Sequence, residues 1–293
     1  MNIPVYIRRR FGLVATVIAC AVSAPVLASE SVHLDKFPTE KMQSMPALQD
    51  GARTFVNYCL NCHSASMMRF NRLQDIGLTD EQISGSLQFT EGRVGDLMKV
   101  AMRHEDGKAW FGAAPPDLSV EARARASESG SGADWIYTYL RSYYRDGSRE
   151  TGWNNAIFPN VGMPNPLWQW QGMRGAVEER VAPVTDEATG KVTGWTKTTI
   201  TYDREGNKSE KVEKVDGDGL HEGTHFTLGT PEGGTLSQAE FDDKVANLVA
   251  FMKVMSDPSA STRGRLGIWV LLFIALFVGC TWWLNREYWK DIK

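Results

Sequence analysis

The chain has 293 residues, of which 23% are charged, and a formal net charge of −3. This length allows one domain of ordinary size with additional segments. The acidic excess lies in residues 29–262, because both ends of the chain are basic. This argues against binding to nucleic acid, whose phosphates would be repelled. An acidic body favours cationic partners through long-range attraction; the alternative is a surface that is acidic only for solubility.

The first predicted element is an export signal at residues 1–28. Three arginines at positions 8–10 precede an apolar run rich in Ala and Val, which ends at small residues. A basic start, a short apolar run and a small-residue cleavage site are typical of a secretory signal. The alternative is an uncleaved membrane anchor, which Pro25 and the short length disfavour.

The motif that carries the chemistry is C-x-x-C-H at Cys59, Cys62 and His63, at the end of a predicted amphipathic helix. It is typical of c-type haem attachment, in which two thiols form thioethers and the histidine ligates the iron. The alternatives are a redox dithiol, which does not need the histidine, half of a zinc site, which needs a second Cys/His pair, and chance. The other two cysteines, Cys20 and Cys280, lie in apolar segments, so we predict one covalent haem c.

The segment after the haem motif contains two predicted helices and a stiff turn. A capping box at Thr79–Gln82 opens a short helix, and the apolar spacing of Val94–Arg103 predicts another. Residues 110–119 then carry aromatic residues and two prolines, which stiffen the backbone and suit a wall against a flat cofactor; the alternative is a plain loop. Arg123 and Arg125 follow, and a guanidinium can bind a haem propionate or be solvated on a helix face.

The next segment contains a predicted second axial ligand. Residues 133–145 read as a helix with a heavy aromatic face, and residues 147–172 lose all periodicity. Met163 stands in this second part, in a loop framed by Gly162 and Pro164. Such framing can hold a thioether sulfur at a fixed position, so we predict Met163 as the sixth iron ligand. The alternative is a buried loop methionine.

Residues 175–222 differ in character. Alternating and β-branched runs separated by turns predict a β-hairpin or small meander inserted into the haem domain. His221 and His225 follow, either as a metal pair or as surface residues. A second capping box at Ser237–Glu240 opens a helix that we expect to pack on the helix before the haem motif.

The C-terminal segment is a predicted membrane anchor at residues 263–284, followed by a cytoplasmic tail at 285–293. Leu266–Leu284 carries no charge, and a helix of this length spans roughly 28 Å, about one hydrocarbon core. Aromatic residues follow it, as in an interfacial belt. With the export signal, this places a haem domain at residues 29–262 on the periplasmic side of a bacterial inner membrane.

The combination resembles cytochrome c1, the haem subunit of the ubiquinol–cytochrome c reductase (cytochrome bc1) complex, from about Gly51 to Leu284. The matching features are the early C-x-x-C-H, Pro-Pro-Asp-Leu-Ser at 115–119, Arg-Ala-Arg at 123–125, Gly-Met-Pro at 162–164 and the single C-terminal anchor. The resemblance implies a mainly α fold: a cytochrome c-like helical haem domain with a β-hairpin insertion and one C-terminal transmembrane helix. It also implies that Met163 is an axial ligand, that Pro116 and Trp135 line the haem, and that Arg125 pairs with a propionate.

The resemblance further implies electron transfer rather than catalysis by this chain alone. A Rieske iron–sulfur subunit would reduce the haem, a soluble cytochrome c would oxidise it, and cytochrome b would be a further partner. The alternatives are a subunit of a terminal oxidase or other respiratory complex, an enzyme or gas sensor with five-coordinate haem, and a structural anchor for a complex.

Overall fold

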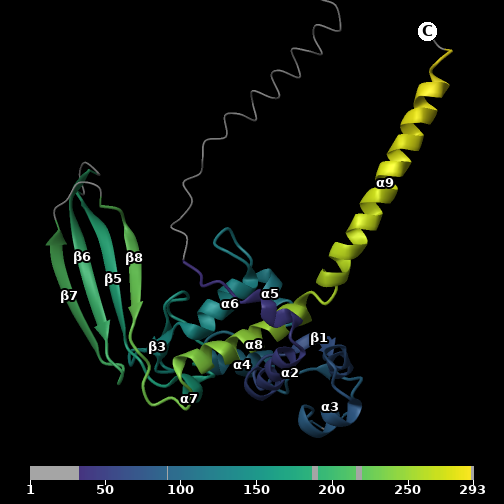
Figure 1. Ribbon diagram of the computed structural model, residues 1–293. Coiled ribbons are helices and arrows are strands. Elements are labelled where there is room, and N and C mark those ends of the chain that lie inside the picture. The colour runs from purple at the N-terminus through teal and green to yellow at the C-terminus, as the bar shows by residue number, and fades with distance from the viewer. Residues whose placement is uncertain (1–32, 91, 187–190, 216–219, 292–293) are drawn as a thin grey trace, which may run out of the picture. The chain divides into compact units, whose positions relative to one another are not determined.

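The structure is a computed structural model that describes residues 33–90, 92–186, 191–215 and 220–291 (Figure 1). The predicted export signal lies outside the described residues. The helices are η1 (Thr39–Gln43), α2 (Met45–Thr54), η2 (Phe55–Cys59), η3 (Phe70–Ile76), α3 (Asp80–Ser86), α4 (His104–Phe111), α5 (Glu121–Ala124), α6 (Gly132–Arg141), α7 (Trp168–Gln171), α8 (Gln238–Ser256) and α9 (Ala260–Tyr288). The strands are β1 (Ala65–Arg69), β2 (Leu97–Met98), β3 (Tyr143–Arg145), β4 (Trp153–Asn155), β5 (Ala176–Thr185), β6 (Val192–Tyr202), β7 (Lys208–Val215) and β8 (Gly223–Leu228). More residues are helical than extended, as the predicted fold class requires.

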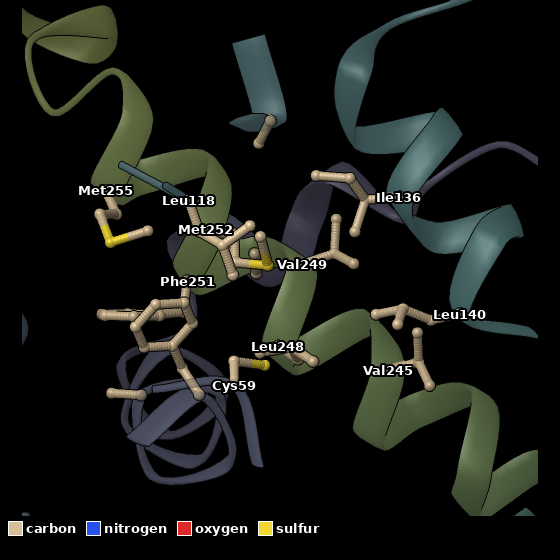
Figure 2. Packing of buried hydrophobic residues seen from close by; sticks show 14 of the residues in the cluster. Cys59, Leu118, Ile136, Leu140, Val245, Leu248, Val249, Phe251, Met252 and Met255 are labelled. Carbon is tan, nitrogen blue, oxygen red and sulfur yellow. The ribbon is translucent and has the colours of Figure 1, made fainter. Parts of the chain in front are cut away.

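Three long helices share one hydrophobic core, in which α8 packs against both α2 and α6. Figure 2 shows the Cys59 side chain, from the haem motif, beside Leu248 of α8. On the other side of α8, Val245 and Val249 lie near Leu140 and Ile136 of α6. The predicted packing of the Ser237 helix on the helix before the haem motif is therefore confirmed, and it ties the haem motif to the centre of the core.

A glycine allows α2 and α8 to approach closely. A Cβ atom at Gly51 would lie 2.0 Å from the Asn247 carbonyl oxygen and 2.9 Å from the Phe251 Cβ atom. Both distances are far inside van der Waals contact, so a larger residue would force the helices apart. The position of η2, which follows α2 directly, depends on this contact.

The predicted helix starts are confirmed by their capping contacts. The Thr79 hydroxyl accepts from the Gln82 N–H, and the Gln82 side chain accepts from the Thr79 N–H. Ser237 and Glu240 form the same reciprocal pair at the start of α8. Such boxes satisfy N–H groups that the first helical turn leaves unpaired.

Two predicted helices differ from the structure. The prediction of a helix at Val94–Arg103 is wrong, because this stretch holds strand β2, which pairs antiparallel with β1. The Val94 carbonyl accepts from the Asn71 N–H at 2.7 Å, so contacts between segments take the backbone groups that a helix would use. The helix predicted at 133–145 ends at Arg141, since β3 then pairs with β4.

The insertion predicted at residues 175–222 is a four-stranded antiparallel sheet of order β7-β6-β5-β8 (Figure 1). It is larger than the predicted hairpin, because β8 continues it to Leu228. Its own small core contains Tyr144 of β3, Ala176, Ile200 and Tyr202, with Phe226 and Leu228 packed against it. His221 and His225 are exposed. Among the described residues, no group of three or more metal-ligating side chains is found.

One described helix, Thr262–Tyr288 within α9, is long and apolar enough to cross a membrane. None of its most apolar window is buried against the rest of the chain. A core helix of a soluble domain would bury such a surface, so the helix is compatible with a membrane anchor. Helix α9 begins at Ala260, a few residues before the predicted start of the anchor at position 263. The Asp257 carboxylate accepts two hydrogen bonds from the Arg263 guanidinium, at 2.8 and 2.9 Å, between the end of α8 and the first turn of α9.

Candidate functional site

Every predicted site residue lines a largely apolar cavity of about 460 Å³. These residues are Cys59, Cys62, His63, Pro116, Arg125, Trp135 and Met163. They come from the end of η2, the extended segment after α4, the end of α5, the first turns of α6 and the loop before α7. The structure thus brings together residues that are up to about a hundred positions apart in the sequence.

The haem motif begins on a π-helical turn. The N–H of Leu60 donates to the Phe55 carbonyl at 3.0 Å, and the N–H of His63 donates to the Cys59 carbonyl at 2.9 Å. Wide turns of this kind occur often at functional sites. Burial raises the pKa of the Cys59 thiol to about 12. The Cys59 side chain is buried and that of Cys62 is half-buried, and both line the cavity.

The imidazole of His63 is oriented by a carbonyl group. Its Nδ1 lies 2.7 Å from the Pro116 carbonyl oxygen, which can only accept, so Nδ1 carries the proton. The Nε2 atom is then left to bind a metal, as in most histidine–metal sites. Burial lowers the pKa of His63, although Pro116, Glu121 and Asp117 act against this. A neutral imidazole is the form that ligates a metal.

The segment that carries Pro116 is itself held firmly. The Asp117 carboxylate accepts from the N–H groups of Ser66 and Ser119, each at 2.8 Å. The N–H of Leu118 donates to the Ser64 carbonyl at 2.8 Å. Pro-Pro-Asp-Leu-Ser therefore does more than line the cavity: it fixes the carbonyl that orients the proposed ligand His63.

Met163 enters the cavity from the loop before α7. A Cβ atom at Gly162 would lie 2.5 Å from the Phe111 carbonyl oxygen, so only glycine fits where this loop meets the end of α4. The Met163 side chain is half-buried and packs against the main core. Its sulfur lies 3.6 Å from the hydroxyl of Tyr139, which donates to it.

Arg125 and Trp135 form one wall of the cavity. The Arg125 guanidinium lies 4.5 Å from the centre of the Trp135 ring, and the Trp135 ring stacks on Tyr139 at 4.8 Å. The Nε–H of Arg125 donates to the Glu121 carboxylate at 2.5 Å. No hydrogen bond of its two Nη groups is found among the described residues, so they are left to bind an anionic group such as a carboxylate.

Sequence reasoning missed several lining residues, among them Tyr58, Tyr139, Phe158 and Met252. Tyr139 looks like any member of the aromatic face of its helix. The available signal was its spacing of four residues from Trp135, which places both rings on one side of α6.

Known proteins resemble this chain over most of its length. The sequence model of the Cytochrome C1 family matches residues 37–174, which include every predicted site residue. A protein of Nitrosomonas europaea named ammonia monooxygenase gamma subunit is 39% identical over 272 residues, 92% of this chain and 94% of that protein. Cytochrome c1 of Allochromatium vinosum is 34% identical over 281 residues, 96% of this chain and 98% of that protein. Cytochrome c1 of Rhodospirillum rubrum is 23% identical over 96% of this chain and 97% of its own.

Proposed function

Because this chain belongs to the cytochrome c1 family, we propose that it carries single electrons from a Rieske iron–sulfur subunit to a soluble cytochrome c within a quinol–cytochrome c reductase. The family binds haem c covalently and serves as an electron-transfer subunit rather than as an enzyme in its own right. The observation that carries the proposal is that His63, Met163 and both motif cysteines line one cavity.

The residues of the cavity fit a haem. Cys59 and Cys62 would form the two thioethers, and His63 Nε2 and Met163 Sδ would ligate the iron. The Pro116 carbonyl binds Nδ1 of the imidazole and leaves Nε2 free, and the thioether is an uncharged donor. The apolar lining suits the porphyrin ring, and the Nη groups of Arg125 suit a propionate.

The haem supplies the chemistry, which is reversible uptake of one electron without transfer of atoms. The chain sets the conditions for this step. Ligation by His63 and Met163 would raise the reduction potential of the haem iron. The apolar side chains around the cavity would limit the access of water. This favours the reduced iron, which carries less charge than the oxidised iron. A raised potential would suit acceptance of an electron from a high-potential Rieske centre and its donation to a soluble cytochrome c.

The proposed location is a bacterial inner membrane, with the haem domain at residues 29–262 on the periplasmic side and residues 285–293 in the cytoplasm. The long apolar helix in α9 supports a single C-terminal anchor. The predicted export signal supports the orientation. Cytochrome b and the Rieske subunit would be the partners in the membrane, and the helical haem domain would have a cytochrome c-like fold.

A substitution at Met163 tests the ligand set. Met163→Leu keeps the size and apolar character of the side chain but removes the sulfur. We expect covalent haem to remain, since the cysteines are intact, while the reduction potential falls and electron flow to cytochrome c is lost. A redox titration and a turnover assay of the purified complex measure these effects. An unchanged potential would remove Met163 from the ligand set.

Another membrane complex is the second candidate setting for the same haem chemistry. It is favoured by the similarity to the protein named ammonia monooxygenase gamma subunit. Purification of the tagged chain from its own membranes separates the two settings. Recovery of cytochrome b and a Rieske protein supports the first, and recovery of oxidase or monooxygenase subunits without them supports the second. Carbon monoxide binding to the reduced protein would instead indicate five-coordinate iron.

A further inference from the structure

Tyr139 donates a hydrogen bond to the sulfur of Met163, with 3.6 Å between oxygen and sulfur. Its ring cannot turn freely: it stacks on Trp135 at 4.8 Å and meets Phe158 edge-on at 6.3 Å. The direction of the hydroxyl is therefore set by packing around the cavity. Tyr139 is also among the residues that line the cavity.

A second tyrosine determines which way the proton of Tyr139 points. Tyr143, which is fully buried, donates its hydroxyl proton to the Tyr139 oxygen at 2.7 Å. Because this oxygen accepts that bond, the Tyr139 proton is left for the sulfur of Met163. A tyrosine hydroxyl is protonated at neutral pH, so Tyr139 can act as the donor. Bonds in such a chain polarise and strengthen one another.

We propose that Tyr139 is a positioning residue that raises the reduction potential of the haem by donating to the Met163 sulfur. This rests on the ligand role proposed for Met163. A thioether sulfur has two lone pairs, of which one can bind iron while the other accepts the proton of Tyr139. That hydrogen bond draws electron density away from the sulfur. The oxidised iron depends more on donation from its ligands than the reduced iron, so the bond favours reduction.

Tyr139→Phe in the full-length protein with covalent haem is the principal test. It removes the hydroxyl and keeps the ring that stacks on Trp135. We expect the ratio of reduced to oxidised haem at a fixed potential to fall two- to tenfold, about the effect of one hydrogen bond. This equals a decrease of roughly 20 to 60 mV for one electron. An equilibrium redox titration measures it, and the sulfur-to-iron charge-transfer absorption of the oxidised protein should shift as well.

Two further tyrosines on or beside the same helix complete the design. Tyr143→Phe removes the donor behind Tyr139, so we expect a smaller decrease in the same direction; it is also the second variant if Tyr139→Phe does not load haem. Tyr137→Phe is the matched control: Tyr137 is buried on α6, but it does not line the cavity. The reduction potential of the Tyr137→Phe protein should equal that of the unmodified protein.

A double variant separates this inference from the proposed function. In a Met163→Leu background, adding Tyr139→Phe should no longer change the potential, since the hydroxyl has lost the sulfur it acts through. An equal decrease with and without Met163 would overturn the inference. The inference would also be overturned if Tyr139→Phe had the same reduction potential as Tyr137→Phe while Met163→Leu still lowered the potential. In that case the proposed function would stand. If Met163→Leu itself has no effect, the ligand assignment fails too.

Discussion

The helical region around the cavity and the four-stranded sheet are built in different ways. The helical region has one continuous core of more than thirty buried residues, drawn from segments across the chain. The sheet has a core of four buried residues. It is otherwise held by its backbone ladder and by the half-buried cross-strand pair Lys197–Glu179.

This difference suggests that the helical region positions the site residues and that the sheet does not. Side chains that must hold an iron need fixed geometry, which dense packing and buried hydrogen bonds supply. The sheet packs around a small core that is separate from the main one, so we expect that it can change without disturbing the cavity. The comparison predicts that substitutions in the helical region alter the haem or global stability, while those in the sheet stay local.

The largest expected effect is loss of the haem itself. Replacing both Cys59 and Cys62 by serine removes the two thiols that form the thioethers, so we expect no haem to stay attached after denaturation. Haem-stained denaturing gels measure this directly. Cys280→Ser is the matched control, since Cys280 is exposed on α9, and its haem content should be unchanged. Attached haem in the double variant would contradict the assignment.

The next effect tests the close packing of the helical region. Gly51→Val places atoms where the Asn247 carbonyl now lies, and we expect a loss of about 3 kcal/mol or more in the free energy of unfolding. Denaturant titration of the full-length protein in detergent measures it. Gly85→Ala in α3, where a Cβ meets nothing within 4 Å, is the control. It should be neutral or stabilise slightly, because alanine favours the helix.

A truncation in the sheet should have a smaller and more local effect. Ile200→Ala removes most of a side chain that is only 4% exposed, and we expect a loss of about 2 kcal/mol, at the low end for such changes. Hydrogen exchange should increase across residues 176–228, while the haem potential stays unchanged. A changed potential would show that the sheet and the cavity are coupled.

The smallest effect concerns a buried carboxylate. Burial acts to raise the pKa of Asp134, but hydrogen bonds from the N–H groups of Phe37 and Ser131 outweigh it, and the pKa is lowered. A lowered pKa stabilises the fold above the unfolded value of about 4, and this stabilisation is lost as pH falls below it. Asp134→Asn should therefore cost about 1 kcal/mol at pH 7 and flatten the acid dependence of unfolding. Glu222→Gln, exposed just before β8, should change neither.

Chemistry carried by local residue patterns was predictable. The C-x-x-C-H motif, the capping boxes at Thr79 and Ser237 and the apolar run of α9 each act within a few neighbouring residues, so the sequence alone reveals them. The framing of Met163 by glycine and proline belongs to the same class. All seven predicted site residues line one cavity. Local residue patterns pointed to Cys59, Cys62, His63 and Met163, whereas the family resemblance supplied Pro116, Arg125 and Trp135.

Contacts between distant segments were decided only by the tertiary structure. The pairing of Leu97–Met98 with β1 overrode a helical pattern. The carbonyls of Val94 and Asp96 accept hydrogen bonds from η3 instead of from their own segment. The Pro116 carbonyl that orients His63 is 53 residues away from it, and Tyr139 is 24 residues from Met163. Periodicity reports which face of an element is apolar, but which hydroxyl or carbonyl lies against a ligand depends on how the whole core packs.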